Sequence, residues 1–511
     1  MALSKTSVEP GPEPGYGADG KPLNATETDT AYDYDADGHV TTTTVCASDF
    51  DACVAGAENP NGPGVGPDGR LHPSFRTTTV SYDPTKFSAP ANAPIAALGY
   101  AKGRFPVVTT DPEGHKTYTA YDPTWGGVTQ STDPNLVGVC NWYDAFGRIV
   151  TQIDRCGSQT PRTTSTQYLQ DSGFIDPRFN VTVTTAPTGS KSWVYTDVFD
   201  RKRTALSQGF DGTLMQQGTT SYDALGRIST ETKPQPYPEL SFYATAHTYD
   251  AVGNESQTTQ DLGPIGGPGT GATSTITRTH FGSTIKTDEL VINGIDPNTL
   301  QAKVEHRQMT ETKNVFGKTA TITKAVNDEP PLSSMTYGYD VDGNLTDTTD
   351  ASGNNVHVVY DIRGRKVSTS DPDVGVVKSV YDGFGDLRAQ TDAKQQEISS
   401  NYDKLGRMIG KVDPDGVSEW IWDVAPGGVG KLAGVNGPIN ANLAAGCSGG
   451  YGQFTDGNRA RTWFSYTAVG DIAESDECAD GELFVTKYGY NDPRFLGRLT
   501  TLRACSPGHP V

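Results

Sequence analysis

A repeat of 21 residues between Met335 and Trp422 constrains the fold of this chain more than any other feature. Each repeat contains Tyr-Asp, two variable residues and Gly, and a second aspartate follows 11 residues after the tyrosine. A fixed period in this range is the signature of a repeat architecture. The repeated positions are Tyr339 and Gly343, Tyr360 and Gly364, Tyr381 and Gly385, and Tyr402 and Gly406, with Asp350, Asp371, Asp392 and Asp413 in the second column.

Each repeat predicts two short strands and two turns. Val356, Val358 and Tyr360 alternate along one face, and a period of two indicates a strand. Asp can bond its own backbone and Gly supplies a positive φ, so the Asp-to-Gly segment predicts a tight turn. An isolated two-stranded hairpin is only marginally stable in water, so the units must pair edge to edge. The expected fold is therefore all-β, an extended antiparallel sheet of hairpins.

Several hexamers carry a family resemblance. Complete copies of Tyr-Asp-x-x-Gly-Arg comprise Tyr143, Asp144, Gly147 and Arg148; Tyr222, Asp223, Gly226 and Arg227; Tyr360 to Arg365; and Tyr402 to Arg407. This unit resembles the YD repeat of Rhs proteins, of the B and C components of bacterial Tc toxins and, more distantly, of teneurins. The middle region around Trp193-Val194-Tyr195 is similar to the Tc B component and SpvB-type proteins. The resemblance covers residues 30–500.

The resemblance implies a curled sheet that forms a hollow shell, a β-cocoon, around a toxic polypeptide. This chain is then a non-catalytic segment of such a shell, and its partners are the toxin polypeptide or other shell segments. Open strand edges template association, so we expect the isolated segment to self-associate.

The alternative is a cell-surface adhesion or carbohydrate-binding module, in which exposed tyrosines stack on a glycan. We favour a structural role for the tyrosines, which we expect to stack on each other along the sheet. A shell needs an interior large enough for a chain, whereas an adhesin needs an exposed binding patch.

Changes in repeat regularity divide the chain into five segments. They are 1–30, a loose N-terminal segment; 31–156, degenerate repeats with a Gly/Pro-rich loop at 55–73; 157–334, an irregular β region; 335–423, the regular array; and 424–511, interrupted repeats that end without a closing domain.

Composition argues against several partners. The net charge is −20, with no basic stripe to neutralise phosphate, so nucleic acid and anionic membranes are disfavoured. No apolar run reaches the length of a membrane span, and the N-terminus contains no apolar signal-peptide core. Hydrophobic residues make up only 34% of the chain, which suits a sheet with at least one wet face.

Candidate metal and catalytic motifs are incomplete. Asp33-x-Asp35-x-Asp37-Gly38 matches the first half of an EF-hand loop, but Thr44 occupies the position of the bidentate Glu. The Gly-rich segment 266–273 lacks the P-loop lysine, and no Gly-x-Ser-x-Gly elbow occurs. The eight histidines are scattered without metal-ligand spacing. We therefore predict no catalytic residues, cofactor or metal site.

Six of the seven cysteines fall into three pairs that are local in sequence. Cys140 precedes a Tyr-Asp turn and Cys156 follows it, at a spacing that can place them on paired strands of one hairpin. We predict a disulfide there, and two more at Cys46–Cys53 and Cys447–Cys478; Cys505 then stays free or pairs beyond Val511. Disulfides persist in oxidising compartments, which predicts a secreted or cell-surface protein. The alternative is isolated buried thiols.

Overall fold

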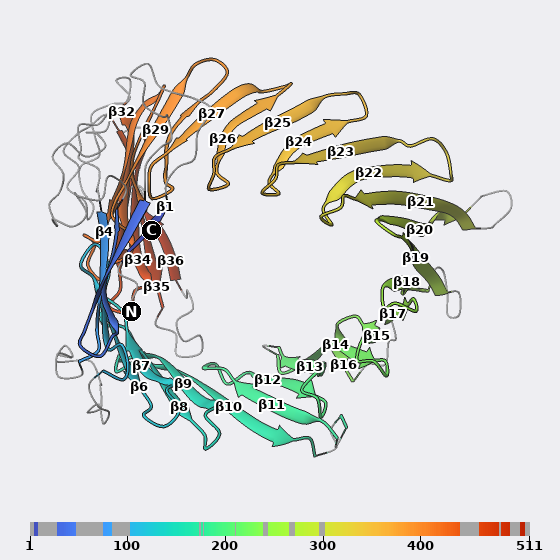
Figure 1. Ribbon diagram of the computed structural model, residues 1–511. Coiled ribbons are helices and arrows are strands. Elements are labelled where there is room, and N and C mark those ends of the chain that lie inside the picture. The colour runs from blue at the N-terminus through green and yellow to red at the C-terminus, as the bar shows by residue number, and fades with distance from the viewer. Residues whose placement is uncertain are drawn as a thin grey trace. The chain divides into compact units, whose positions relative to one another are not determined.

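The computed structural model contains strands and turns, and no helix occurs among the residues it describes (Figure 1). Those residues are 5–8, 28–46, 75–83, 103–172, 175–176, 178–209, 211–238, 244–264, 271–295, 302–439, 459–479, 482–490 and 501–505. The chain divides into two compact units. Unit 1 comprises 1–164, 361–368 and 376–511, and unit 2 comprises 165–360 and 369–375.

Most strands belong to one unit, whereas β10 (Arg162–Gln170), β26 (Lys366–Asp371) and β27 (Gly375–Tyr381) cross unit boundaries. Unit 1 otherwise contains β1 (Lys5–Val8), β2 (Thr28–Tyr34), β3 (Val40–Cys46), β4 (Phe75–Ser81), β5 (Val108–Thr110), β6 (Lys116–Tyr121), β7 (Val128–Thr132), β8 (Gly138–Tyr143), β9 (Ile149–Cys156), β28 (Leu387–Thr391), β29 (Glu397–Tyr402), β30 (Met408–Asp413), β31 (Gly416–Trp422), β32 (Leu432–Ile439), β33 (Arg459–Tyr466), β34 (Ile472–Ala479), β35 (Glu482–Gly489) and β36 (Thr501–Cys505). Unit 2 contains β11 (Asn180–Thr185), β12 (Lys191–Thr196), β13 (Lys202–Gln208), β14 (Leu214–Tyr222), β15 (Ile228–Thr232), β16 (Gln235–Tyr237), β17 (Ala244–Tyr249), β18 (Glu255–Pro264), β19 (Gly271–Phe281), β20 (Thr284–Ile295), β21 (Ala302–Lys313), β22 (Thr319–Val326), β23 (Ser333–Tyr339), β24 (Leu345–Asp350) and β25 (Asn355–Tyr360).

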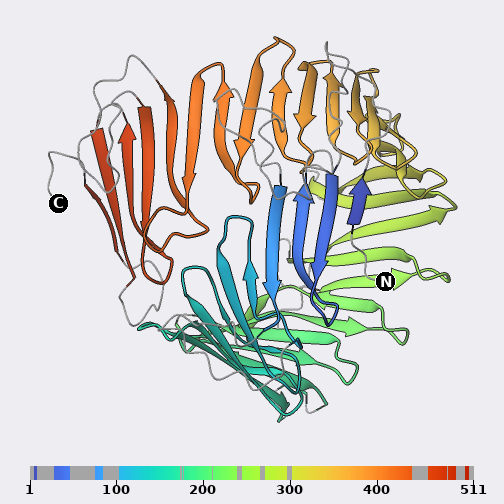
Figure 2. The same ribbon diagram turned by 60° about the vertical axis from the view of Figure 1, so that its left-hand side comes forward.

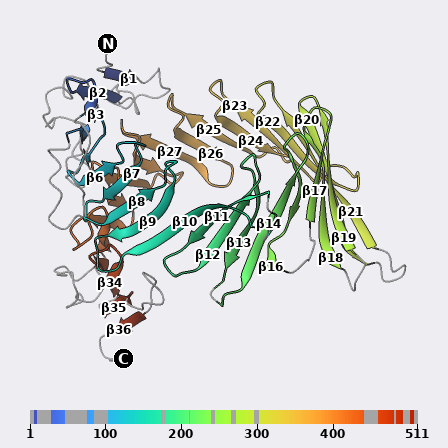
Figure 3. The same cartoon turned by 90° about the horizontal axis from the view of Figure 1, so that it is seen from below.

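The strands pair antiparallel, mostly with their neighbours along the chain. In unit 2 the pairing runs in order from β11 to β25, except that β14 pairs with both β15 and β16 and β15 also pairs with β17 (Figure 3). Unit 1 contains two such runs, β1 to β9 and β27 to β36 (Figure 2). The predicted all-β fold, an antiparallel sheet of hairpins, is confirmed.

The Tyr-Asp turn closes each hairpin with one backbone pattern. At the turn after β8, Gly147 N–H donates to the Asp144 carbonyl (3.1 Å), and Asp144 N–H donates to the Arg148 carbonyl (2.9 Å). Gly147 has a φ of +77°, and the strand register shifts between Trp142 and Tyr143. These features define a type I turn followed by a left-handed glycine and a bulge. The repeated glycine is required because this backbone conformation disfavours a side chain.

The turn aspartate holds the loop through its carboxylate. Asp144 Oδ1 accepts hydrogen bonds from the N–H groups of Phe146 (2.8 Å) and Arg148 (3.0 Å), and Oδ2 accepts one from Arg148 Nε (2.8 Å). In four other turns the aspartate accepts hydrogen bonds from the three equivalent donors of its own turn; these aspartates are Asp197, Asp223, Asp361 and Asp403. Less regular repeats therefore keep the turn, even where Asp200 replaces the glycine with a φ of 61°.

The second column of aspartates uses related turns. Asp350 Oδ1 accepts the N–H groups of Ser352 (2.8 Å) and Asn354 (2.9 Å), and Asn354 Nδ2 donates to Oδ2 (2.8 Å). The Asn354 side chain thus donates to the turn aspartate in the same way as the repeat arginine does in the Tyr-Asp turns. The two turns of a repeat are therefore both closed by an aspartate.

Each repeat tyrosine reaches back to the preceding hairpin. Its hydroxyl donates to a backbone carbonyl at the start of an earlier strand, as Tyr402 does to Leu387 (3.0 Å). A cation from the preceding turn also lies over several rings: Arg201 over Tyr222, Arg227 over Tyr249, Lys318 over Tyr339, Arg365 over Tyr381 and Lys431 over Tyr466, at 4.2–5.3 Å from the ring centroid. The contacts of these rings thus differ from the tyrosine-on-tyrosine stacking expected from the sequence.

The hydrophobic core is thin. Its main cluster contains Val181, Tyr195 and Leu206, which lie on the adjacent strands β11, β12 and β13. Burial raises the pKa of Tyr195 to about 12. The N-terminal segment expected to be loose contributes β1, which pairs with β2. The Gly/Pro-rich loop at 55–73 lies outside the described residues.

The predicted disulfide between Cys140 and Cys156 is present, linking β8 to β9 with a Cα–Cα distance of 5.8 Å. Cys46 and Cys478 are also disulfide-bonded. Their predicted partners, Cys53 and Cys447, lie outside the described residues, as does the side chain of Cys505.

Replacing a turn glycine tests this turn geometry. Gly226 has a φ of +84°, so Gly226→Val should destabilise unit 2 by about 1–3 kcal/mol, because a β-branched residue is strained there. Gly226→Asn is the matched control and should cost less, because Asn tolerates the left-handed region. Chemical denaturation measures both variants, and equal stability of the Val variant and the unmodified protein would contradict the turn assignment.

Candidate functional site

Unit 1 contains side-chain contacts between two distant stretches of the chain, which we call the turn seam. Turns and adjoining residues after β27, β29, β31 and β33 meet residues of the segment from β4 to β9. The contacts are Arg76–Asp386, Glu113–Lys404, His115–Asp423, Asn135–Val429 and Arg155–Asp471. Both members of the pairs advance along the chain in the same order. The seam thus joins two rows of hairpin ends.

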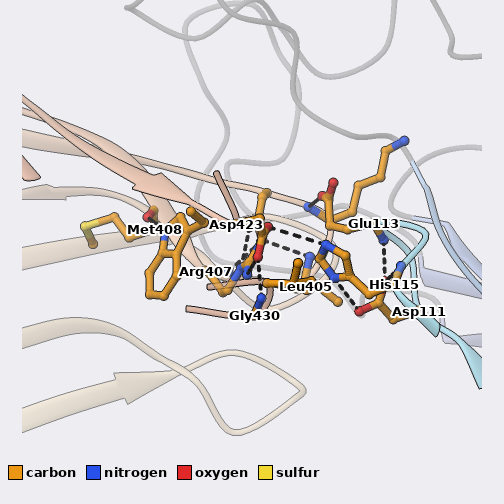
Figure 4. A network of polar contacts seen from close by, with 12 residues as sticks. Asp111, Glu113, His115, Leu405, Arg407, Met408, Asp423 and Gly430 are labelled. Carbon is orange, nitrogen blue, oxygen red and sulfur yellow. Dashed lines mark hydrogen bonds and ion pairs between the residues drawn. The ribbon is translucent and has the colours of Figure 1, made fainter. Parts of the chain in front are cut away.

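The seam contains a charged cluster around Arg407 (Figure 4). Its Nε lies 2.6 Å from Asp403 Oδ2 in its own turn, and its Nη2 lies 2.6 Å from Asp423 Oδ2 after β31. Asp423 also accepts a hydrogen bond from the Gly430 N–H (2.6 Å). One arginine therefore ties two successive hairpins together through two carboxylates.

His115 brings the other stretch into this cluster. Its Nε2 lies 3.6 Å from Asp423 Oδ2, and its Nδ1 lies 2.9 Å from Asp111 Oδ2 in its own turn. Beside it, Lys404 N–H donates to Glu113 Oε1 (2.9 Å). Burial lowers the pKa of Arg407, but the hydrogen bonds from Arg407 to Asp423 and Asp403 outweigh that effect and raise it. Burial raises the pKa of Asp423, whereas its hydrogen bonds with Arg407 and Gly430 lower it overall.

Further contacts lie on either side of this cluster. Arg76 pairs with Asp386, and its guanidinium lies 4.1 Å from the centroid of the Phe384 ring. Arg155, at the end of β9, places Nη2 2.6 Å from Asp471 Oδ2. Ion pairs therefore occur at both ends of the seam.

A carboxamide makes a reciprocal contact in the same row. Asn135 Nδ2 donates to the Val429 carbonyl, and the Val429 N–H donates to Asn135 Oδ1, both at 2.8 Å. The seam therefore combines ion pairs with hydrogen bonds to backbone.

The turn aspartates differ in the direction of their pKa shift. At Asp144 and Asp223, desolvation raises the pKa, but hydrogen bonds from the turn backbone and the repeat arginine outweigh it and lower the pKa. At Asp382, in the turn that contains Phe384, burial dominates and raises the pKa.

The structure distributes the predicted repeat residues among many hairpins, and only some of them reach the seam. Gly406 reaches the seam, because a Cβ atom added at this glycine would lie only 3.3 Å from Arg76 Nη1. Sequence reasoning missed Arg76, His115, Asn135 and Arg155, which belong to no repeated motif. Arg76 lies in β4 and Arg155 in β9, whereas His115 and Asn135 lie in the turns after β5 and β7, and neither of these is a Tyr-Asp turn.

The half EF-hand motif forms an ordinary turn. Ligand atoms of Asp35, Asp37 and His39 lie within 4.8 Å of one another. However, Asp35 Oδ1 accepts the N–H groups of Asp37 (3.0 Å) and His39 (2.9 Å), which are the turn's own bonds. Asp33 lies in β2, where it pairs with Thr42.

Among the described residues, no helix is both long and apolar enough to cross a membrane.

Comparisons with known proteins agree with this architecture. Residues 339–373 and 381–418 match the family model described as RHS Repeat. The fold is similar to the crystal structure of TcdB2-TccC3 without its hypervariable C-terminal region, at 13% identity and a TM-score of 0.55, covering 96% of this chain and 32% of that one. The crystal structure of TcdB2-TccC3 gives 13% identity and a TM-score of 0.53, covering 97% and 34%.

A third similar structure is the Photorhabdus luminescens Tc holotoxin pore, at 13% identity and a TM-score of 0.52, covering 96% of this chain and 34% of that one. No curated protein matches the sequence significantly. The chain thus contains Rhs (YD) repeats and has a fold of the Tc toxin type. It spans about a third of the length of the Tc chains it matches.

The turn aspartates predict an acid-sensitive fold. The pKa values of Asp144, Asp223, Asp250, Asp340 and Asp350 are lowered in the folded chain. Their stabilising contribution is therefore complete above the unfolded pKa of about 3.9 and is lost as pH falls through the lower folded values. Thermal unfolding midpoints should drop most steeply below about pH 4. Asp223→Asn should reduce this dependence, and an unchanged midpoint down to about pH 2 would contradict the mechanism.

A double-mutant cycle tests the seam. Arg155→Ala and Asp471→Ala should each destabilise unit 1, with a coupling energy of about 1–3 kcal/mol, because removal of one partner leaves the other shielded charge unpaired. The pair Arg178–Asp176 is the control, since the Arg178 side chain is 83% exposed. Exposed pairs contribute little. Chemical denaturation measures both cycles, and equal coupling in the two pairs would refute a specific role for the seam.

Proposed function

We propose that the chain is a non-catalytic segment of a shell in an Rhs/Tc-type toxin, where it encloses or presents a toxin polypeptide. The observation that carries the proposal is the turn seam. A sheet bonded only along its strand ladder is a ribbon, whereas the seam attaches one stretch of ribbon to another by their turns. Hydrogen-bonded pairs across it lie 291 to 316 positions apart in the sequence. Such lateral attachment is what a continuous wall requires.

The use of the charged side chains supports a structural role. The turn aspartates bind backbone N–H groups and the repeat arginines, and His115 bridges two carboxylates. These groups are engaged in closing hairpins or joining them. The similarity to TcdB2-TccC3 over 96% of the chain supports the same role by fold.

The tyrosine contacts favour the shell over the carbohydrate-binding alternative. Tyr222 and Tyr249 each donate their hydroxyl to a backbone carbonyl and carry an arginine over the ring. A sugar would have to displace that arginine to stack on the same ring face. The rings are therefore better placed to join hairpins than to bind a glycan.

The disulfides support a secreted or cell-surface location. Cys140 pairs with Cys156, and Cys46 and Cys478 are disulfide-bonded as well. Such bonds persist in oxidising compartments. We infer that the shell works outside the cytoplasm, together with other shell segments or a toxin polypeptide as partners.

Protease protection tests the enclosure. The complete reading frame that encodes this chain is sequenced first. The protein that it encodes is then expressed and treated with trypsin. We expect a polypeptide encoded with the shell to resist digestion, and a product that combines Arg155→Ala with Arg407→Ala to lose that protection. Equally fast digestion of the polypeptide in the full product and in isolation would overturn the proposal. Binding to a glycan array together with full digestion would instead favour the adhesion module.

A further inference from the structure

The pairing of β8 with β9 contains one extra residue beside the disulfide. Val139 pairs with Asp154, whereas the preceding residue of β8 pairs with Cys156. Arg155 is therefore an extra residue in β9, and its φ of 59° lies in the left-handed region. In a bulge of this kind the left-handed residue is usually glycine. An arginine at this position needs a reason, because the conformation disfavours a side chain.

The bulge brings the two cysteines within reach of each other. Cys140 pairs with Ile153, and in a regular ladder the residue two positions beyond Ile153 lies on the same face of the sheet. That residue would be Arg155, and Cys156 would lie on the other face. The extra residue moves Cys156 into this place, where the Cα atoms of the two cysteines are 5.8 Å apart. The disulfide therefore requires the bulge, and it holds the bulge in turn.

The residue that forms the bulge is also the one that reaches the turn seam. Arg155 is only 9% exposed, and its Nη2 donates to both carboxylate oxygens of Asp471, each at 2.6 Å. In a regular ladder, Arg155 would take the place opposite Gly138 that Cys156 now occupies. A shift of one residue moves a side chain by about 3.3 Å along the strand. Such a shift would break both contacts with Asp471.

We propose that the Cys140–Cys156 disulfide is a redox-sensitive switch for the Arg155 end of the turn seam. While the disulfide is intact, the bulge persists and Arg155 binds Asp471. Reduction removes the bond that holds the bulge, so Arg155 returns to the extended conformation that a residue with a side chain prefers. The contact with Asp471 is then released. This inference does not depend on whether the shell encloses a toxin.

A dithiol supplies the electrons for this step. Its thiolate attacks Cys156 Sγ, because Cys156 is half-buried whereas Cys140 is only 6% exposed. The S–S bond breaks, and Cys140 Sγ leaves as a thiolate that takes up a proton. The second thiol of the reductant then attacks the mixed disulfide and releases Cys156 as a thiol. Two electrons and two protons thus pass to the protein, and the dithiol becomes a disulfide.

Redox equilibration of the full chain tests the switch. If the disulfide stabilises the seam contact, the seam contact stabilises the disulfide to the same extent. The protein is equilibrated with dithiol buffers of graded reducing strength, free thiols are alkylated, and the peptides that contain Cys140 and Cys156 are quantified by mass spectrometry. Asp471→Asn should shift the equilibrium constant for reduction of this bond by about fivefold or more towards the thiols.

Glu474→Gln is the matched control for this shift. It also removes one negative charge, three positions further along the chain, but Glu474 pairs with Lys487 rather than with Arg155. Its equilibrium constant for reduction should equal that of the unmodified protein. Equal constants for Asp471→Asn and the unmodified protein would overturn the proposal. An equal shift in both variants would overturn it as well, because a general effect of charge would then explain the result.

Hydrogen–deuterium exchange tests the reverse direction without any reductant. The Thr467 N–H donates to the Asp471 carbonyl within one turn. In Cys140→Ser combined with Cys156→Ser, this N–H should exchange about fivefold faster or more. The turn from Asp382 to Asp386, at the other end of the seam, should keep its exchange rate. Unchanged exchange at Thr467, or equal acceleration at both turns, would contradict a switch at this end of the seam.

Discussion

The structure depends on one interaction, the binding of three donors by the carboxylate of the turn aspartate. In Asp144 these donors are two N–H groups of the turn and the guanidinium of the repeat arginine. Without that carboxylate, the loop would lose the acceptor for donors that the tight backbone cannot satisfy itself. The bond also fixes the bulge beside the tyrosine, and the bulge sets the strand register. A sheet with so thin a core needs its register defined at the turns, because packing alone defines it weakly.

The arginine and the tyrosine carry this local order from one hairpin to the next. Arg227 is oriented by Asp223 and lies over the ring of Tyr249, whose hydroxyl donates to the Ile228 carbonyl. Lys318 and Tyr339 make a similar cation–ring contact in a less regular repeat. At Arg407 the ring is Trp422, whose Nε1 donates to the Met408 carbonyl. In each case a cation lies over an aromatic ring, although the residue types differ from one repeat to the next. Stability of this kind comes from contacts between neighbouring units, as in other repeat proteins.

Local features of the sequence predicted local features of the structure. The period predicted the hairpins, the Asp and Gly positions predicted the turns, and the spacing of Cys140 and Cys156 predicted their disulfide. The sequence could not predict which group lies over the Tyr222 ring, because a repeated tyrosine in a strand is equally compatible with a cation or with another ring as its neighbour. The seam was not predictable. Arg155 and Asp471 lie 316 positions apart, and no period relates them. Their contact depends on the accumulated geometry of all intervening hairpins.

The charge balance explains how an acidic chain can still form a cohesive seam. The sequence has 61 acidic and 41 basic residues, yet many turn aspartates satisfy their oxygens with backbone N–H groups rather than with cations. The excess of carboxylates therefore does not require an equal number of ion pairs. Arg76 and Arg155 belong to no repeat turn, so they remain available to bind carboxylates of the distant stretch. Arg407 does both, since it holds its own turn aspartate and the Asp423 carboxylate that His115 approaches. The aspartates that close the hairpins thus leave the cations free to join one row of hairpins to another.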